Sequence, residues 1–324
     1  MKIPVRTDGQ VVVTGSIAFD QIMLFPGKFE EHILPDRLHA INVSFLVSEM
    51  RTQRGGCSGN IGYTLALLDV DSRLVATAGN DFEDYKAWLN RHGVDTTQVV
   101  VHDDIRTASC MITTDEAANQ ITGFYVGAMS RAADLSLKER QGDRPALAII
   151  APDDPGAMVR HCREAREAGL TFFFDPSFQV IAMDGEALAE GARGAAGLFV
   201  NDYELAVFQE KTGRKDDEIF DLVDMVVVTL GGDGSRIMLR DGTRIEVPVA
   251  RVDDFVEPTG AGDAYRAGFI AGLMRGDDLI TCGKTGAVAA AYAVEQRGTQ
   301  THAFTQDEFN RRYEDNFGPR PTKD

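Results

Sequence analysis

The sequence has few basic residues for its acidic content. It carries 33 lysines and arginines against 50 aspartates and glutamates, which gives a formal net charge of -17. Because a surface that binds nucleic acid needs clustered lysine and arginine, this balance argues against a nucleic-acid partner. An acidic protein can still bind a phosphorylated ligand where backbone N–H groups, a metal and a few basic side chains supply the attraction.

Cysteine and long apolar runs are also scarce. The four cysteines, Cys57, Cys110, Cys162 and Cys282, lie far apart in 324 residues and show no CxxC spacing. This usage favours a reduced cytoplasmic protein over a disulfide framework. No apolar run approaches the ~18 residues of a membrane span, and the first ten residues lack the apolar stretch of a signal peptide. We therefore expect a cytoplasmic protein without a membrane partner.

Short apolar runs that end in polar residues alternate with helical segments through most of the chain. The clearest case is 146–177, which reads as a strand, a helix from near Pro155 to Gly169, and a second strand. The same strand-then-polar design recurs at 11–15, 197–204 and 225–234. This alternation predicts an α/β fold with a doubly wound, mostly parallel sheet that binds ligands at the carboxyl ends of its strands.

Two regions break the alternation. Residues 20–53 and 106–129 read as paired strands with no helix between them. We expect these inserts to pack together as a small β lid over the edge of one domain that spans residues 1–324. The aromatic side chains Phe45, Phe124 and Tyr125 could stack on a purine or pack within this lid.

The stretch EPTGAGDAYRAG (257–268) places three glycines within nine residues where a helix begins. The N–H groups of Gly260, Ala261 and Gly262 would point out of the first helical turn, where the helix dipole favours an anion. Asp263 would repel that anion unless it acts as a base, taking a proton from a hydroxyl while the amides hold the phosphoryl charge. The alternative is a glycine-rich turn in which Asp263 only offsets the helix dipole.

Five stretches in order along the chain resemble the signatures of the ribokinase family, the PfkB-type sugar and nucleoside kinases. They are GSIAFD (15–20), RGGCSGNIG (54–62), NDYE (201–204), TLGGDG (229–234) and TGAGD (259–263). Within the family, residues 15–47 most resemble bacterial adenosine kinases, with further similarity at 124–130, 175–179 and 266–269. The resemblance implies a ribokinase-like fold, ATP as co-substrate, Mg²⁺ as cofactor, and transfer to a primary hydroxyl, above all the 5′-OH of adenosine. It also implies a candidate homodimer formed through the lids.

The resemblance assigns the acceptor to residues of the first two motifs. Asp20, near Ser16, would bind vicinal hydroxyls such as those of a ribose; the alternative is a surface aspartate in a turn. Gly55 and Gly56 would let the backbone approach the sugar, or they form an ordinary turn at a helix start. Asn60 can both donate and accept hydrogen bonds there. Phe124 and Gln179 complete the predicted acceptor site.

The later motifs imply the nucleotide side. The predicted ATP-binding residues are Asn201, Thr229, Gly231 and Gly234. Glu204 would hold Mg²⁺ through water, since this ion keeps several waters and takes few protein ligands. The spacing of Asn201 and Glu204 also fits a helix capping box, and the 229–234 loop also fits a plain hairpin turn.

The sequence departs from the family's pattern at three places. Glu257 stands where Asp is usual, in a neighbourhood that helps to bind a monovalent cation such as K⁺ with the loop that 295–300 resembles. Ser109 stands where adenosine kinases of this type place a Phe that stacks on adenine, and the Arg expected shortly after Gln179 is absent. These departures leave a ribose, fructose or related sugar kinase as the alternative. A non-catalytic nucleotide- or sugar-binding regulator is a third possibility, against which the intact Asp263 argues.

Overall fold

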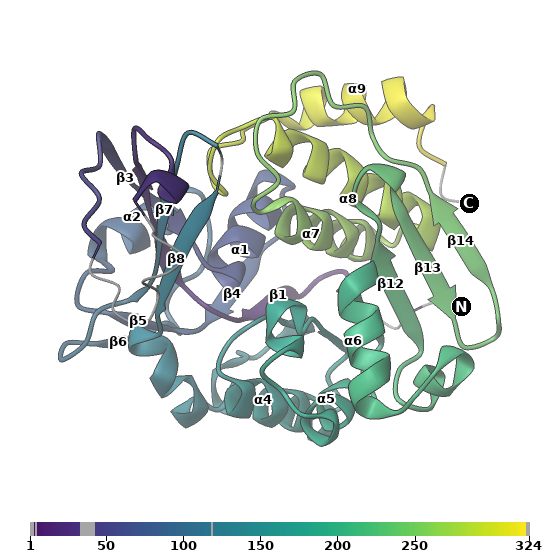
Figure 1. The fold of residues 1–324 in the computed structure, drawn as a ribbon. Helices are drawn as coiled ribbons and strands as arrows, with labels where there is room; N and C mark the ends of the chain where they lie inside the picture. Colours follow the sequence, from purple (N-terminus) through teal and green to yellow (C-terminus); the bar gives the residue numbers. More distant parts are fainter. Residues whose placement is uncertain (1–2, 4, 33–42, 118, 322–324) are drawn as a thin grey trace.

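An eight-stranded sheet runs through the computed structural model, which describes residues 3, 5–32, 43–117 and 119–321 (Figure 1). In spatial order its strands are β14 (Arg244–Val247), β13 (Ser235–Leu239), β12 (Met225–Thr229), β11 (Gly197–Asn201), β10 (Phe172–Phe174), β9 (Pro145–Ile150), β1 (Gln10–Thr14) and β4 (Ser72–Val75). Neighbouring strands from β12 to β4 pair in parallel, whereas β13 pairs antiparallel with β12 and with β14. The predicted mostly parallel sheet is confirmed.

Helices cover both faces of this sheet (Figure 1). One face carries α1 (Cys57–Leu67), α2 (Glu83–Arg91), α7 (Ala261–Arg275), α8 (Leu279–Val294) and α9 (Gln306–Phe317); the other carries α3 (Leu137–Arg140), α4 (Pro155–Glu167), α5 (Gly185–Ala192) and α6 (Asp202–Thr212). Along β1, Val11 and Val13 pack in the first core and Val12 packs in the second. The strands read as continuous apolar runs because both of their faces are buried.

Local signals set the ends of the helices as the sequence predicts. The Asp154 side chain accepts a hydrogen bond from the Ala157 N–H at 3.0 Å, and Pro155 occupies the first helical position of α4. Gly169 follows the end of α4 with φ at 65°. No helix among the described residues is long and apolar enough to cross a membrane, and all four cysteines are free.

The two inserts form one separate four-stranded sheet, seen at the left of Figure 1. Its order is β3 (Glu49–Gly55), β2 (Ala18–Leu24), β7 (Ala108–Thr114) and β8 (Gln120–Tyr125). Each insert supplies an antiparallel pair, and β2 joins β7 in parallel. The two inserts therefore share one sheet, as expected, although residues 33–42 of the first insert lie outside the described residues. A two-stranded sheet of β5 (Thr77–Gly79) and β6 (Val100–His102) lies apart from both.

Candidate active site

Asp263 lies in the first turn of α7, half-buried behind a glycine that the backbone requires. Gly260 precedes the helix with φ at 82°, in the left-handed region that favours glycine. Asn60 Nδ2 donates to Asp263 Oδ2 at 2.8 Å, and Gln300 Nε2 donates to Asn60 Oδ1 at 3.0 Å. Gln300 therefore fixes the Asn60 amide in the orientation that donates to Asp263.

The surroundings of Asp263 strengthen it as a proton acceptor. Burial raises the pKa of Asp263, while Arg266 and the hydrogen bond from Asn60 offset part of this increase. A carboxylate with a raised pKa is a better general base at neutral pH than an exposed one. The predicted base is thus placed in an environment that suits the role.

A buried ion pair that was not predicted from the sequence lies against the glycine loop, residues 260–262. Arg266 Nη2 donates to Asp175 Oδ1 at 2.7 Å, and Arg266 Nε lies 2.5 Å from Asp175 Oδ2. The side chains are 7% and 0% exposed. A Cβ on Gly262 would lie 2.5 Å from Arg266 Nη1, so the close approach of this arginine requires glycine there. The available signal was Asp175 itself, a carboxylate directly after the apolar β10.

Asp20 lies on lid strand β2 rather than in a turn, so the alternative of a surface turn aspartate is wrong. A Cβ on Gly55 would lie 2.5 Å from Asp20 Oδ2, and one on Gly56 would lie 2.5 Å from the Ser16 carbonyl oxygen. Burial, followed by the charges of Glu257 and Asp263, raises the pKa of Asp20 to about 6. The two motifs that predict the acceptor site are therefore in direct contact, and Asp20 faces Gly55 and Gly56.

Ser16 joins the end of β1 to the start of α1. Its Oγ accepts a hydrogen bond from the Cys57 N–H at 3.2 Å, and its carbonyl oxygen accepts one from Ser58 Oγ at 2.9 Å. These contacts hold the amino end of α1 against the carboxyl end of β1. Ser16 therefore has a structural role beside the predicted acceptor contact, which stays a prediction.

Cross-strand register decides which lid side chains share the face of Asp20. Asp20 pairs with Cys110, and Cys110 pairs with Phe124, so these three side chains project from the same face. Ser109 pairs with Tyr125 on the opposite face and is buried, with its Oγ donating to a backbone oxygen. Phe124 is 45% exposed on the Asp20 face and is therefore the ring available to an acceptor there. Ser109 therefore projects from the face opposite to Asp20.

Asn201 and Glu204 form the capping box that their spacing also allowed. The Glu204 N–H donates to Asn201 Oδ1 at 2.7 Å, and the Asn201 N–H donates to Glu204 Oε2 at 2.8 Å. No group of three or more His, Cys, Asp or Glu among the described residues could by itself hold a metal ion. A single carboxylate suits an ion held mainly by phosphates and water, so the role of Glu204 toward Mg²⁺ stays a prediction.

Three of the four predicted nucleotide residues line one pocket of about 410 Å³, and the fourth, Asn201, is not among its lining residues. Thr229, Gly231 and Gly234 line it together with Ala261 and Gly262 of the glycine loop. The 229–234 loop is thus both the turn between β12 and β13 and part of a pocket wall. Nothing in the sequence analysis identified the rest of the lining: Gly232, Val249, Ala250, Val252, Phe255, Pro258, Tyr265, Ala287, Ala290, Ala291 and Val294.

Gln179 and Glu257 each have a protein partner already. Gln179 Nε2 donates to the buried Asp153 carbonyl oxygen at 2.6 Å. Glu257 Oε2 accepts from the Gly298 N–H at 3.2 Å, so residue 257 lies against the 295–300 loop as the resemblance implies. Acceptor binding by Gln179 and a K⁺ site near Glu257 stay predictions.

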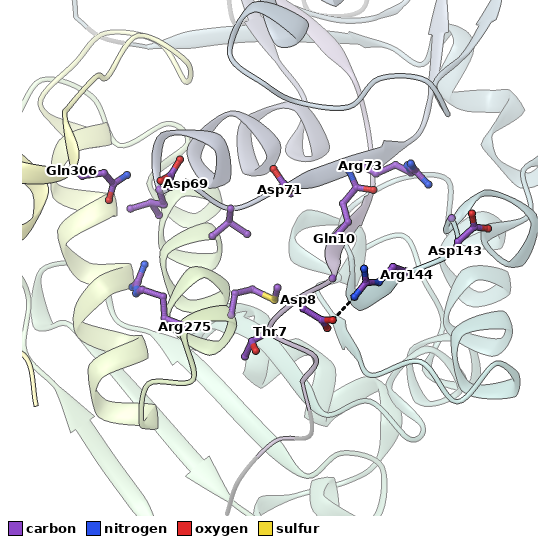
Figure 2. A pocket seen from close by; sticks show the side chains of 15 residues that line it. Thr7, Asp8, Gln10, Asp69, Asp71, Arg73, Asp143, Arg144, Arg275 and Gln306 are labelled. Atoms are coloured by element: carbon purple, nitrogen blue, oxygen red, sulfur yellow. Dashed lines mark hydrogen bonds and ion pairs between the residues drawn. The ribbon is translucent and has the colours of Figure 1, made fainter. Parts of the chain in front are cut away.

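A larger hollow of about 960 Å³ lies away from these residues, beside the amino end of β1 (Figure 2). Its polar lining is largely engaged within the protein. Arg144 binds Asp8, Arg73 Nε donates to Asp95 Oδ2 at 2.7 Å, and Gln306 Nε2 donates to a backbone oxygen at 2.7 Å. None of the predicted site residues lines this hollow, so the smaller pocket is the candidate site.

Comparisons with known proteins agree with this geometry. The model of the pfkB family carbohydrate kinases matches residues 11–306. A nucleoside kinase from Methanothermobacter thermautotrophicus is 31% identical over 318 residues, which cover 97% of this chain and 98% of the relative. The structure of Burkholderia thailandensis nucleoside kinase in complex with inosine matches at a TM-score of 0.86 and 38% identity, over 97% of this chain and 100% of that chain. The structure of the same kinase in complex with ADP-inosine matches at a TM-score of 0.84 and 40% identity, over 97% of this chain and 98% of that chain. The family match includes every predicted site residue.

Proposed function

The chain belongs to the pfkB family of carbohydrate kinases, and from this premise we propose that it transfers a phosphoryl group from ATP to the 5′-hydroxyl of a nucleoside. One observation carries the proposal. Asp263 lies between the pocket lined by Ala261 and Gly262 and the lid face that carries Asp20. A hydroxyl bound beside Asp20 would therefore meet the base and the terminal phosphoryl group at the same place.

The transfer needs a proton acceptor and a site for negative charge. Asp263 takes the proton as the hydroxyl oxygen attacks the γ-phosphorus and the bond to the β-phosphate oxygen breaks, releasing ADP. The N–H groups of Gly260 and Gly262 stabilise the phosphoryl group in transit, since the amino end of α7 favours an anion. The Ala261 N–H, which was predicted to join them, donates instead to the Pro258 carbonyl oxygen at 3.2 Å. Asn60 holds Asp263 in place through its 2.8 Å hydrogen bond. The catalysis is mainly positioning and charge stabilisation.

A magnesium ion on the nucleotide phosphates supplies further charge neutralisation when it is bound. Glu204 would hold it, because it lies in the first turn of α6, directly after β11, whose last residue Asn201 pairs with Thr229 of the pocket. The Glu204 carboxylate keeps one oxygen in the capping box and has its other oxygen for water around the ion.

Adenosine is the acceptor we propose first, from the resemblance of residues 15–47. Phe124 on the Asp20 face supplies a ring on which a purine can stack. Inosine is the second candidate, because a relative at 38% identity over 97% of this chain binds it. The alternative is a ribose or fructose kinase, whose acceptor carries no purine. We place the enzyme in the cytoplasm and propose a homodimer through the lid, whose β8 side chains are exposed.

One coupled assay for ADP release tests the reaction and the base together. Wild type is offered adenosine, inosine, ribose and fructose with ATP and Mg²⁺, and Asp263→Asn is measured beside it. We expect turnover of nucleosides to exceed that of free sugars, and Asp263→Asn to lower turnover by roughly 10²–10⁴-fold with little change in KM.

The matched control is Asp307→Asn, because Asp307 lies in the first turn of α9, far from the site. If Asp263→Asn costs no more than this control, then Asp263 only offsets the helix dipole. If ribose or fructose is turned over better than every nucleoside, the sugar-kinase alternative replaces our proposal.

A further inference from the structure

One wall of the nucleotide pocket has no regular structure of its own. Between β14 and α7, Ala250, Val252 and Phe255 line the pocket, and Phe255 is 66% exposed. The intervening residues Arg251 and Asp253 line a different hollow on the far side of the same segment. Because the segment alternates in this way, whatever holds Arg251 and Asp253 also decides where the pocket side chains lie. We refer to residues 250–256 as the pocket wall.

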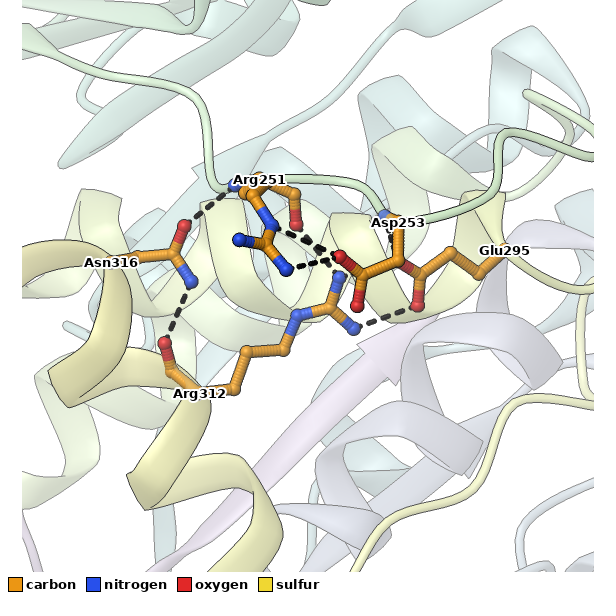
Figure 3. A network of polar contacts seen from close by, with 5 residues as sticks. All are labelled: Arg251, Asp253, Glu295, Arg312 and Asn316. Atoms are coloured by element: carbon orange, nitrogen blue, oxygen red, sulfur yellow. Dashed lines mark hydrogen bonds and ion pairs between the residues drawn. The ribbon is translucent and has the colours of Figure 1, made fainter.

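Three side chains from other elements, Glu295, Arg312 and Asn316, hold this wall (Figure 3). Glu295, the residue after α8, accepts from the Asp253 N–H at 2.8 Å. Arg312 of α9 donates to the Arg251 carbonyl oxygen at 2.8 Å. The same arginine binds Glu295 through two hydrogen bonds, of 2.8 Å and 2.6 Å. The carboxylate and the guanidinium thus bind each other and, separately, two backbone groups of the wall.

The pair is well shielded for a surface network. The side chains of Arg312 and Glu295 are 13% and 15% exposed, and the guanidinium carbon lies 4.4 Å from the centre of the Tyr292 ring. Asn316, one turn along α9, accepts from the Arg251 N–H at 2.7 Å. A bidentate pair of an arginine and a carboxylate fixes orientation as well as distance. The contacts therefore define a single position for the wall.

Glu295 is also the first residue of the 295–300 loop, which contacts the residues around Asp263. Gly298 of this loop donates to Glu257, and Gln300 donates to Asn60, which holds Asp263. The Thr299 hydroxyl donates to the Arg54 carbonyl oxygen at 2.8 Å. These contacts anchor the far end of the loop independently of Arg312. Loss of the Glu295–Arg312 pair should consequently move the wall more than it moves Asp263.

We propose that Glu295 and Arg312 are positioning residues for the nucleotide, so that the last helix of the chain sets the affinity for ATP and ADP. The proposal rests on the proposed function, since it takes the pocket of about 410 Å³ as the nucleotide site. Neither side chain lines that pocket; both act through the wall. The chemical class of the ligand is an adenine nucleotide, whose planar base suits apolar walls formed by valine, alanine and phenylalanine.

The test is Arg312→Met, which removes the guanidinium and keeps the apolar stem over Tyr292. We expect the Kd for ADP, measured by calorimetry, and the KM for ATP to rise by roughly 3- to 30-fold, the range of residues that act on a site indirectly. The KM for the acceptor should change less than about 2-fold because the loop beyond Gly298 keeps its own anchors. Arg312→Lys should recover part of the affinity.

The chain offers a matched control in Arg166→Met. Arg166 of α4 binds Glu190 at 2.5 Å and donates to the Arg193 carbonyl oxygen at 2.8 Å, on the opposite face of the sheet. It therefore combines an ion pair with a backbone contact as Arg312 does, away from the pocket. Its loss should lower the Tm without changing the Kd for ADP.

Each outcome is decisive. Equal Kd values for Arg312→Met and Arg166→Met would make the Glu295 pair merely structural and overturn the proposal. If Arg312→Met does not fold, Glu295→Gln keeps an acceptor for the Asp253 N–H while removing the charge; an unchanged Kd in that variant also overturns the proposal. If wild type binds no ADP, the assignment of the pocket and the proposed function fail first, and this outcome is distinct from the others.

Discussion

The proposed acceptor side and the proposed nucleotide side of the site differ in how they are built. The acceptor side is made of charged and polar side chains on strand ends and helix starts, namely Asp20, Asn60 and Asp263. The nucleotide side is made of backbone, glycines and small apolar side chains from α8 and the pocket wall. On the first side, side-chain chemistry makes the contacts; on the second, shape does. A change of one functional group should therefore damage the acceptor side, whereas a change of volume should damage the nucleotide side.

After the loss of the proposed base Asp263, the largest effect is expected on the acceptor side, at Asp20. A hydrogen bond to a charged group contributes about 1.5–3 kcal/mol, so loss of one ribose hydroxyl should lower kcat/KM by about 10- to 100-fold. We expect wild type to prefer adenosine over 2′-deoxyadenosine by this factor, and Asp20→Ala to lose both efficiency and most of this preference. Equal kcat/KM values for the two nucleosides in wild type would show that Asp20 does not bind the diol.

The pH dependence at Asp20 sharpens this expectation. Because burial and the charges of Glu257 and Asp263 raise the pKa of Asp20 to about 6, kcat/KM for the acceptor should fall as the pH drops below about 6. Stability should change in the opposite sense. The folded state keeps this proton to a higher pH than the unfolded state, so the carboxyl destabilises the protein as the pH rises from about 4 to about 6. Asp20→Asn should thus gain stability over wild type at pH 8 and not at pH 4.

A volume change should affect only the nucleotide side. Ala290 of α8 is half-buried and lines the pocket, so Ala290→Leu adds three carbons where the nucleotide would lie. We expect the KM for ATP to rise by about 10-fold, the lower end of what a mismatched methylene costs in an apolar pocket. The KM for the acceptor should not change.

Ala189→Leu is the matched control for this substitution, because Ala189 is half-buried on α5 over the opposite core. Both variants add the same side chain to a helix that packs on the sheet. A similar rise in the KM for ATP in both would attribute the effect to general loss of packing and would break the comparison between the two sides.

The smallest effect is expected at Glu204, the proposed magnesium residue. Glu204→Gln keeps the capping geometry, since glutamine also serves in a capping box, and removes only the charge. A charge near the ion is worth about 1 kcal/mol in water, so the Mg²⁺ concentration for half-maximal rate should rise roughly 5-fold. The control is Glu308→Gln, because Glu308 forms the same capping box with Thr305 in α9. An unchanged Mg²⁺ titration in Glu204→Gln would leave helix capping as its role.

Residues that act through their own functional groups were predictable from the sequence. Asp263 and the glycines before it were predicted because a carboxylate among glycines at a helix start is unusual for a residue with only a structural role. The lid was predicted because two apolar segments have no helix between them, and the structure joins them through β2 and β7. The capping box of Asn201 and Glu204 was predicted as an alternative and is present.

Residues whose role depends on distant partners were not predictable. Arg266 and Asp175 are 91 positions apart, and nothing local marks them as a pair. The alanines of α8 have the composition of an ordinary buried helix, and only their place beside the pocket wall makes them part of a site. Ser109 matches a stacking position in the resemblance, and only the cross-strand register places it on the strand face opposite to Asp20.

The sequence by itself determined the alternation of strands and helices, the two inserts, and the position of a carboxylate at a glycine-rich helix start. These features follow from hydrophobic periodicity and from local backbone chemistry, which act over a few residues. Only the tertiary structure decided that Phe124 shares the face of Asp20, that Arg266 supports the glycine loop, and that Arg312 holds the pocket wall. Cross-strand register and helix packing bring such residues together, and both depend on the chain as a whole.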